Sequence, residues 1–166
     1  MDLVLPKLDK KLLIAESLIF NRGYRLEQLS SLKNVLSPRE NWDNWSYVVF
    51  PINQDNNHWT LAIAHNNGRV DFYDSMGQNL KDERWNLICR ILKALKDNNF
   101  NPIYNRVNPN SIYQQTDSTS CGVAVCMFAE RFLKGESLIF TRNDTFKWRD
   151  QAYRLLFDIL RKVNKL

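Results

Sequence analysis

The sequence has few of the residues that build metal sites and disulfide frameworks. It contains two histidines and three cysteines, at positions 89, 121 and 126. No C-x-x-C pair or histidine–cysteine cluster has the spacing of a zinc site, so we expect neither a metal nor a cofactor. The low, odd cysteine count argues against a disulfide framework and favours a reducing compartment, the cytoplasm or the nucleus. No apolar run approaches the ~18 residues of a membrane span, and the amino-terminal residues lack the pattern of a secretory signal.

The chain also lacks a concentrated basic surface, although its formal net charge is +5. Its lysines and arginines are scattered, with no basic helix and no aromatic-interleaved patch, so we expect no nucleic-acid partner. The 166 residues carry no linker and no repeat. This length predicts a single domain over residues 1–166, and we expect a monomer. A high asparagine and lysine content would also fit a protein that a symbiont, parasite or virus secretes into a host cell.

Periodicity predicts a pair of adjacent strands between helical segments. Residues 58–64 alternate with period two, and the Asn66-Asn67-Gly68 turn is a strong hairpin signal. The other predicted strands cover residues 47–52, 70–73 and 103–107, and the predicted helices cover about 9–20, 26–36, 82–96, 121–133 and 144–163.

Cys121 stands at the start of a run that is apolar nearly all round. The backbone N–H groups at a helix N-terminus favour a thiolate, which makes Cys121 a candidate nucleophile. Gly122 leaves room for a substrate backbone beside it. Taken alone, Cys121 would be better interpreted as a buried structural cysteine. Cys126 and Cys89 lie inside helical runs, and we interpret Cys126 as a small core residue and Cys89 as a structural one.

His58 supplies the imidazole that a cysteine nucleophile needs. It opens its strand, whereas His65 lies beside the hairpin turn at the other end. Residues 58 and 74 are symmetric about Asn66, so a hairpin centred there brings the Asp74 carboxylate near His58 Nδ1 and orients the ring toward Cys121. Asp71 is the competing carboxylate, but its pairing position is nearer the turn and we expect it to be exposed.

A neutral amide precedes the cysteine by six positions. Gln115 could form an oxyanion hole together with the backbone N–H of Cys121. Gln114 is adjacent, and spacing alone does not separate the two.

Three motifs together resemble the Ulp/SENP family of ubiquitin-like-protein proteases. They are His58-Trp59-x-Leu61, the stretch Phe72-Tyr73-Asp74-Ser75-Met76-Gly77, and Gln115-x₅-Cys121-Gly122-x₃-Cys126. The resemblance runs from about Tyr47 to Leu133. It implies an α+β, papain-like fold of permuted order, with a small central mixed sheet flanked by helices.

The resemblance also implies the site. Cys121 would be the nucleophile, His58 the general base and acid, Asp74 its orienting carboxylate and Gln115 an oxyanion donor. Trp59 resembles the family tryptophan that covers the narrow channel for a Gly-Gly tail. The implied partner is ubiquitin or a ubiquitin-like protein, with SUMO favoured over NEDD8 and ubiquitin because it is the family's most frequent substrate.

Two departures bear on the substrate. The family usually has an acidic residue immediately before the nucleophile, where this chain has Ser120, with Asp117 nearby. The usual amino-terminal Trp-Leu-x-Asp segment is not recognisable, and Trp42 and Trp45 are the candidates to replace it. Two other functions remain open: an acetyl-CoA-dependent acyltransferase of the same clan, and an inactive module that binds a ubiquitin-like protein.

Overall fold

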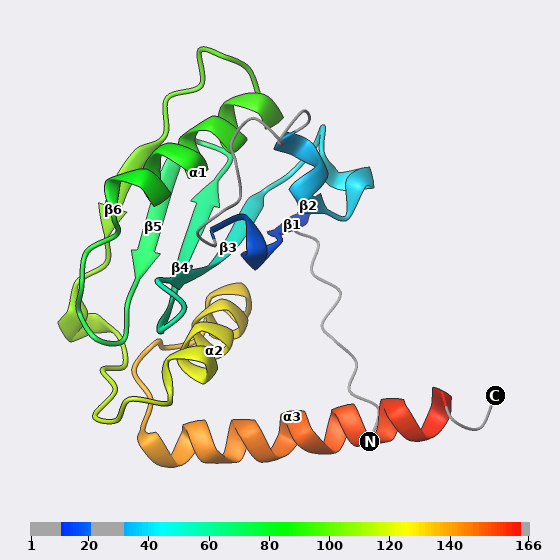
Figure 1. Cartoon of the computed structure of the whole chain (residues 1–166), viewed down its shortest axis with the longest axis vertical. Helices are drawn as coiled ribbons and strands as arrows, with labels where there is room; N and C mark the ends of the chain where they lie inside the picture. Colours follow the sequence, from blue (N-terminus) through cyan, green and yellow to red (C-terminus); the bar gives the residue numbers. More distant parts are fainter. Residues whose placement is uncertain (1–10, 21–31, 164–166) are drawn as a thin grey trace.

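The computed structural model describes residues 11–20 and 32–163, and in them six strands form one mixed sheet. The strand order is β2-β1-β3-β4-β5-β6 (Figure 1). The strands are β1 (Leu12–Ala15), β2 (Leu36–Ser37), β3 (Tyr47–Gln54), β4 (His58–His65), β5 (Arg69–Tyr73) and β6 (Ile103–Arg106). The helices are α1 (Asp82–Leu95), α2 (Cys121–Lys134) and α3 (Arg142–Val163), with short 3-10 turns η1 (Ser17–Phe20), η3 (Leu32–Val35), η4 (Arg39–Asn41) and η5 (Pro109–Ser111).

The three central strands form an antiparallel meander, as the sequence predicts. β3 pairs with β4 from Tyr47↔His65 to Gln54↔His58, and β4 pairs with β5 through the predicted hairpin turn. Gly68 has φ +100, a conformation that glycine adopts without steric cost. The outer strands β1 and β6 add parallel to β3 and β5.

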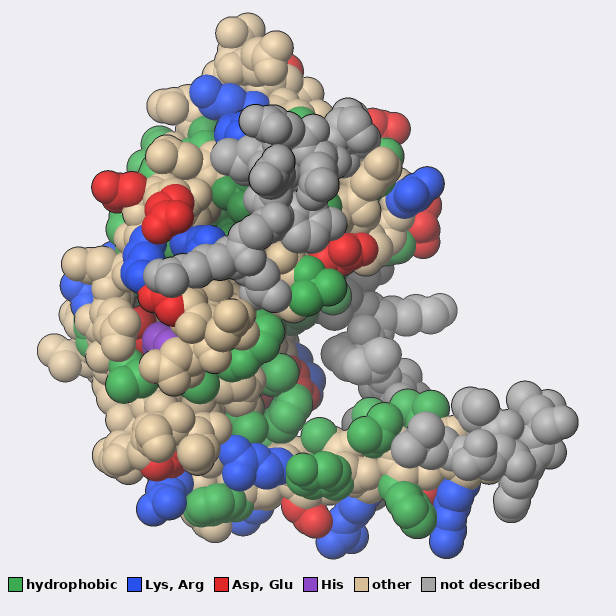
Figure 2. All heavy atoms as spheres, viewed as in Figure 1, with side chains coloured by type: hydrophobic (Ala, Val, Ile, Leu, Met, Phe, Trp, Pro, Cys, Tyr) green, Lys and Arg blue, Asp and Glu red, His purple; other side chains and the backbone are tan. Residues whose placement is uncertain are grey.

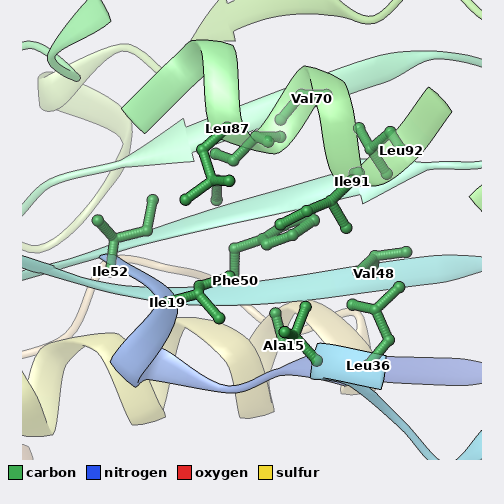
Figure 3. Close-up of a cluster of buried hydrophobic side chains, with 14 of the residues drawn as sticks. Ala15, Ile19, Leu36, Val48, Phe50, Ile52, Val70, Leu87, Ile91 and Leu92 are labelled. Atoms are coloured by element: carbon green, nitrogen blue, oxygen red, sulfur yellow. The ribbon is translucent and has the colours of Figure 1, made fainter. Parts of the chain in front are cut away.

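Both faces of the sheet are covered, which explains why the central strands are apolar on both sides. One cluster of buried side chains fills the space between α1 and the sheet (Figure 3). In it Phe50 packs with Ile91 and Leu92 of α1. The second cluster joins the opposite face to α2 and includes Ile63 and Phe128. Because α2 packs directly on β4, its first residue is held close to the end of that strand.

The two amino-terminal helix predictions are wrong where the structure describes them. Within 9–20 the chain forms β1 and η1, and within 26–36 it forms η3 and the start of β2. The apolar spacing that suggested a helix instead serves a strand: Leu13 and Ala15 are buried while Ile14 is 47% exposed. Pairing with β3 overrides the local pattern. Residues 9, 10 and 26–31 lie outside the described residues.

The remaining predictions agree with the structure. The predicted helices at 82–96, 121–133 and 144–163 correspond to α1, α2 and α3, and Gly135 ends α2 in the left-handed conformation with φ +70. The α+β class, with a small mixed sheet flanked by helices, is therefore confirmed.

The helix α3 contacts α2 near its first turns and then continues past it (Figure 1). Hydrophobic side chains remain exposed along its second half (Figure 2). No helix in the described part of the chain has both the length and the apolar character of a membrane span.

Candidate active site

His58 is the first residue of β4 and is almost entirely buried, at 6% exposure. Its Nε2 lies 2.7 Å from Asp74 Oδ1. A polar turn precedes it, in which Asp55 and Asn56 adopt positive φ. His58 therefore lies at the end of the sheet where β5 ends and α2 begins (Figure 1).

Asp74 directly follows β5, and its carboxylate is fixed by the turn that it starts. Oδ1 accepts from Met76 N at 2.7 Å, and Oδ2 accepts from Gln78 N at 3.0 Å. The side chain of Asp74 is only 2% exposed. Because backbone N–H groups hold both oxygens, the carboxylate cannot swing away from His58.

The contact between His58 and Asp74 forms in a different register from the predicted one. The β4–β5 pairs Leu61↔Tyr73 and Ala64↔Val70 are symmetric about residue 67, not 66. Continuing that register places Asp74 opposite residue 60, so the two side chains meet diagonally, a separation that long side chains span. The predicted ring atom is also wrong, because Nε2 and not Nδ1 faces Asp74.

Cys121 is the first residue of α2 and is 6% exposed. Its thiol is one of the groups that raise the pKa of His58. Since Nε2 faces Asp74, the ring nitrogen left for Cys121 is Nδ1. The hydrogen bond with Asp74 is the main reason that the pKa of His58 lies above its usual value; burial opposes the rise, and the contact with Cys121 adds to it.

The turn before Cys121 is organised by Asp117. Its Oδ1 accepts from the backbone N–H of Thr119 at 2.8 Å and of Ser120 at 2.7 Å. Its Oδ2 accepts from Ser120 Oγ at 2.8 Å. The Thr119 N–H and the Ser120 hydroxyl lower the pKa of Asp117, so the carboxylate stays ionised. An acidic group thus lies one hydrogen bond from position 120, although that position itself is a serine.

Both glutamines of the loop have partners. Gln115 Nε2 donates to the backbone carbonyl of Asp117 at 2.6 Å, and Gln115 Oε1 accepts from Ser75 Oγ at 2.5 Å. Gln114 is exposed, and its Nε2 donates to the carbonyls of Asp74 at 3.3 Å and Tyr113 at 3.1 Å. No local pattern singles out Ser75, because its partner lies forty residues away and only the fold brings the two together.

Trp59 of β4 lies beside Gly122, the second residue of α2. A Cβ added at Gly122 would be 3.7 Å from Trp59 Cδ1, an ordinary van der Waals distance. Both residues are half-buried. The structure thus brings the indole of Trp59 over the backbone that follows Cys121.

Trp42 and Trp45 do not reach this end of the sheet. The Trp45 carbonyl accepts from Asn66 Nδ2 at 2.7 Å, in the hairpin turn at the other end of β4. Seven strand steps of ~3.3 Å separate that end from His58, about 23 Å in all. Trp45 is 4% exposed and packs against Phe100, so it is a core residue.

The prediction that Asp71 is exposed is wrong. Its exposure is 2%, and it accepts from His65 Nε2 at 2.8 Å, Asn105 Nδ2 at 2.6 Å and Arg69 Nη2 at 2.7 Å. Burial pushes the pKa of Asp71 up, but the hydrogen bonds outweigh it and hold that pKa below its usual value. This second histidine–aspartate pair lies beside the hairpin turn, away from Cys121.

The other two cysteines differ from each other. Cys89 is half-buried, and burial raises the pKa of its thiol. Cys126 is exposed, so the interpretation of it as a core residue is wrong. It follows Cys121 by five positions, which places it on another side of α2. Among the described residues, no group of three His, Cys, Asp or Glu side chains is placed to hold a metal ion.

Comparisons with known proteins agree with this fold. The model of the Ulp1 protease family, C-terminal catalytic domain, matches residues 27–163. No curated protein sequence matches the chain. Among solved structures, the C-terminal Ulp1 protease domain in complex with Smt3, the yeast ortholog of SUMO, is 18% identical, with a TM-score of 0.58 over 86% of this chain and 66% of that one.

Two further structures are similar. The catalytic domain of the Ulp1-like SUMO protease from Chaetomium thermophilum is 21% identical, with a TM-score of 0.53 over 80% of this chain and 54% of that one. The Rickettsia bellii effector protein RickCE is 21% identical, with a TM-score of 0.53 over 69% of this chain and 46% of that one. The chain therefore spans about half to two thirds of these structures. Since the family model covers most of the sequence and the solved structures share its fold, the chain belongs to the Ulp1 protease family.

Proposed function

We propose that this protein is a cysteine peptidase that cleaves after the C-terminal Gly-Gly of a ubiquitin-like modifier. The observation that carries the proposal is the buried His58–Asp74 pair, with the Cys121 thiol interacting with the same imidazole. One ring nitrogen faces a buried carboxylate at 2.7 Å, and the Cys121 thiol is among the groups that raise the pKa of the same ring. A thiol, an imidazole and a carboxylate in this order are the parts of an activated cysteine nucleophile.

The chemistry follows from those contacts. Cys121 transfers its proton to His58, and the thiolate attacks the carbonyl carbon of the terminal glycine. The oxyanion that forms accepts hydrogen bonds from the Cys121 backbone N–H and the Gln115 amide. His58 then gives its proton to the leaving amine, the C–N bond breaks, and a thioester remains. Water, deprotonated by His58, hydrolyses the thioester and releases the modifier with a free carboxylate.

The Gly-Gly preference is supported by the crowding beside Cys121. The indole of Trp59 lies against the backbone of Gly122, next to Cys121, and we infer that it limits the room for side chains on a peptide that approaches the thiol. Glycine residues carry no Cβ and pass most easily through a narrow channel. Among the modifiers we favour SUMO, because one of the similar structures is a SUMO protease and another is in complex with the yeast ortholog of SUMO; NEDD8 and ubiquitin are the other substrates to test.

Activity probes of the three modifiers, each ending in a propargyl group that traps a catalytic cysteine, test the proposal. We expect one of them to label the wild-type protein and the same modifier's coumarin amide to be hydrolysed. The Cys121→Ala variant should lose both reactions while keeping its fold. Cys126→Ala is the matched control: the same substitution on the same helix, at an exposed thiol, should leave both reactions intact.

The outcomes separate the proposal from its rivals. Labelling that persists in Cys121→Ala would contradict the assignment of the nucleophile. A protein that binds a modifier without reacting would be a binding module. A protein that acquires label from radioactive acetyl-CoA and cleaves no modifier would be an acyltransferase.

A further inference from the structure

Ser75 joins the two halves of the candidate site. It follows Asp74 in the chain and is 2% exposed. Its carbonyl accepts from Gln115 N at 2.8 Å, and its hydroxyl donates to Gln115 Oε1 at 2.5 Å. Two hydrogen bonds between the same two residues fix both the backbone and the side chain of Gln115 against the turn that holds Asp74.

The partners of Gln115 also determine which way its amide points. A glutamine amide has one acceptor oxygen and an NH₂ group with two donors. The carbonyl of Asp117 can only accept, so the NH₂ group must face it, which it does at 2.6 Å. The Ser75 hydroxyl then meets Oε1 as a donor. One N–H of the amide is used by Asp117, and the second remains for another acceptor.

We propose that Ser75 is a positioning residue that holds the Gln115 amide so that its free N–H meets the oxyanion formed at Cys121. This inference rests on the proposed function. Ser75 is buried and acts through Gln115 without touching the substrate. Donors that are already oriented before reaction stabilise a developing charge without reorganising, and a free glutamine side chain would lose that advantage. Consecutive residues, Asp74 and Ser75, thus orient the imidazole and the oxyanion donor from one turn.

Steady-state hydrolysis of the preferred modifier's coumarin amide tests the role. We expect Gln115→Ala to lower kcat by about 10²–10³-fold, as for other oxyanion donors. Ser75→Ala should lower kcat by roughly 10–100-fold with KM nearly unchanged, the range seen when a group that orients a functional residue is removed. Ser75→Thr keeps the hydroxyl and should recover most of the lost rate.

The double variant decides whether Ser75 works through Gln115. Without the amide there is nothing for the hydroxyl to orient, so Ser75→Ala combined with Gln115→Ala should be no slower than Gln115→Ala alone. Losses that multiply would overturn the proposal, and so would a Ser75→Ala enzyme with wild-type kcat. Ser111→Ala is the matched control, since Ser111 Oγ also donates to a loop carbonyl, Asn108 O at 2.7 Å, but in an exposed turn.

Alkylation of Cys121 by iodoacetamide distinguishes positioning from general damage. This reaction needs the thiolate and His58 but forms no oxyanion. Ser75→Ala should therefore keep the wild-type dependence of the alkylation rate on pH. A shifted profile would mean that Ser75 supports the whole site, against the proposal. If the wild-type protein cleaves no modifier, the proposed function fails; if it cleaves and Ser75→Ala is unaffected, only this inference fails.

Discussion

Replacing Asp74 with asparagine removes the charge beside His58 while keeping the shape of the side chain. Asp74 accepts from His58 Nε2 and Met76 N at Oδ1, and from Gln78 N at Oδ2. With its carbonyl at the Oδ1 position, an asparagine keeps the first two contacts, but its NH₂ group then faces the Gln78 N–H, donor against donor. We expect a loss of about 1–3 kcal/mol of unfolding free energy from this unpaired buried group, and a folded protein.

The loss of charge changes how the protein responds to pH. In the wild type, Asp74 raises the pKa of His58 above its usual value of 6.5. The stabilisation that this provides is fully present below 6.5 and is lost as pH rises through the raised folded-state pKa. In Asp74→Asn that contribution is absent. The difference in unfolding free energy between the two proteins should therefore be larger near about pH 6 than near about pH 9.

The pH dependence of catalysis should also differ between the wild type and Asp74→Asn. An imidazolium that persists to higher pH keeps the thiolate paired, so the alkaline limb of the wild-type profile should lie at higher pH than that of Asp74→Asn. The rate should fall by roughly 10²–10⁴-fold, the usual contribution of general acid–base catalysis, because His58 loses the carboxylate that orients it.

Three measurements check this: urea unfolding at the two pH values, the pH profile of modifier–coumarin hydrolysis, and the pH profile of Cys121 alkylation. Asp150→Asn is the matched control, since Asp150 is exposed and pairs with Arg154 of the same helix; it should change none of them. An alkaline limb that stays in place, or a stability difference that is the same at both pH values, would refute the reasoning.

Three further predictions follow from the same contacts. Gly122→Ala should keep the wild-type Tm, because the added methyl meets Trp59 at an ordinary 3.7 Å, yet it should lower kcat/KM on modifier substrates by narrowing the approach to the thiol. Asp71→Ala should lose about 2–3 kcal/mol in urea unfolding at neutral pH, since it leaves His65 without its buried acceptor; because the pKa of Asp71 is held low, the loss should shrink as pH falls through that pKa. Phe128→Ala, at a site 1% exposed between α2 and the sheet, should lose about 3–5 kcal/mol, and a loss under about 1 kcal/mol would show that the site collapses without leaving a cavity.

Sequence patterns over a few neighbouring residues predicted the helices and strands that have strong local signals. Alternation identified β4, Asn66-Asn67-Gly68 identified the hairpin, and Gly135 marked the end of α2. It failed for β1, where only four residues are in strand and their partner β3 begins thirty-five positions later. A strand this short depends on pairing with a distant segment, and the spacing of its apolar residues also fits a helix.

For the candidate site, the sequence predicted the residues but not their exact geometry. Residue type and order selected His58, Asp74 and Cys121, and hairpin symmetry correctly suggested that the first two are neighbours. That symmetry missed by one residue, because the three-residue turn 66–68 is centred on residue 67 and not on Asn66. His58 and Asp74 still meet, because their side chains reach each other diagonally across the two strands.

By itself, the sequence determined which chemical groups are present and the family to which they belong, because those depend on residue identity and order. Only the tertiary structure decided the ring atom that faces Asp74, the burial of Asp71 and the exposure of Cys126. It alone paired Ser75 with Gln115 across forty residues. These features depend on strand register and on how α2 packs on β4, and such long-range geometry leaves no local signal along the chain.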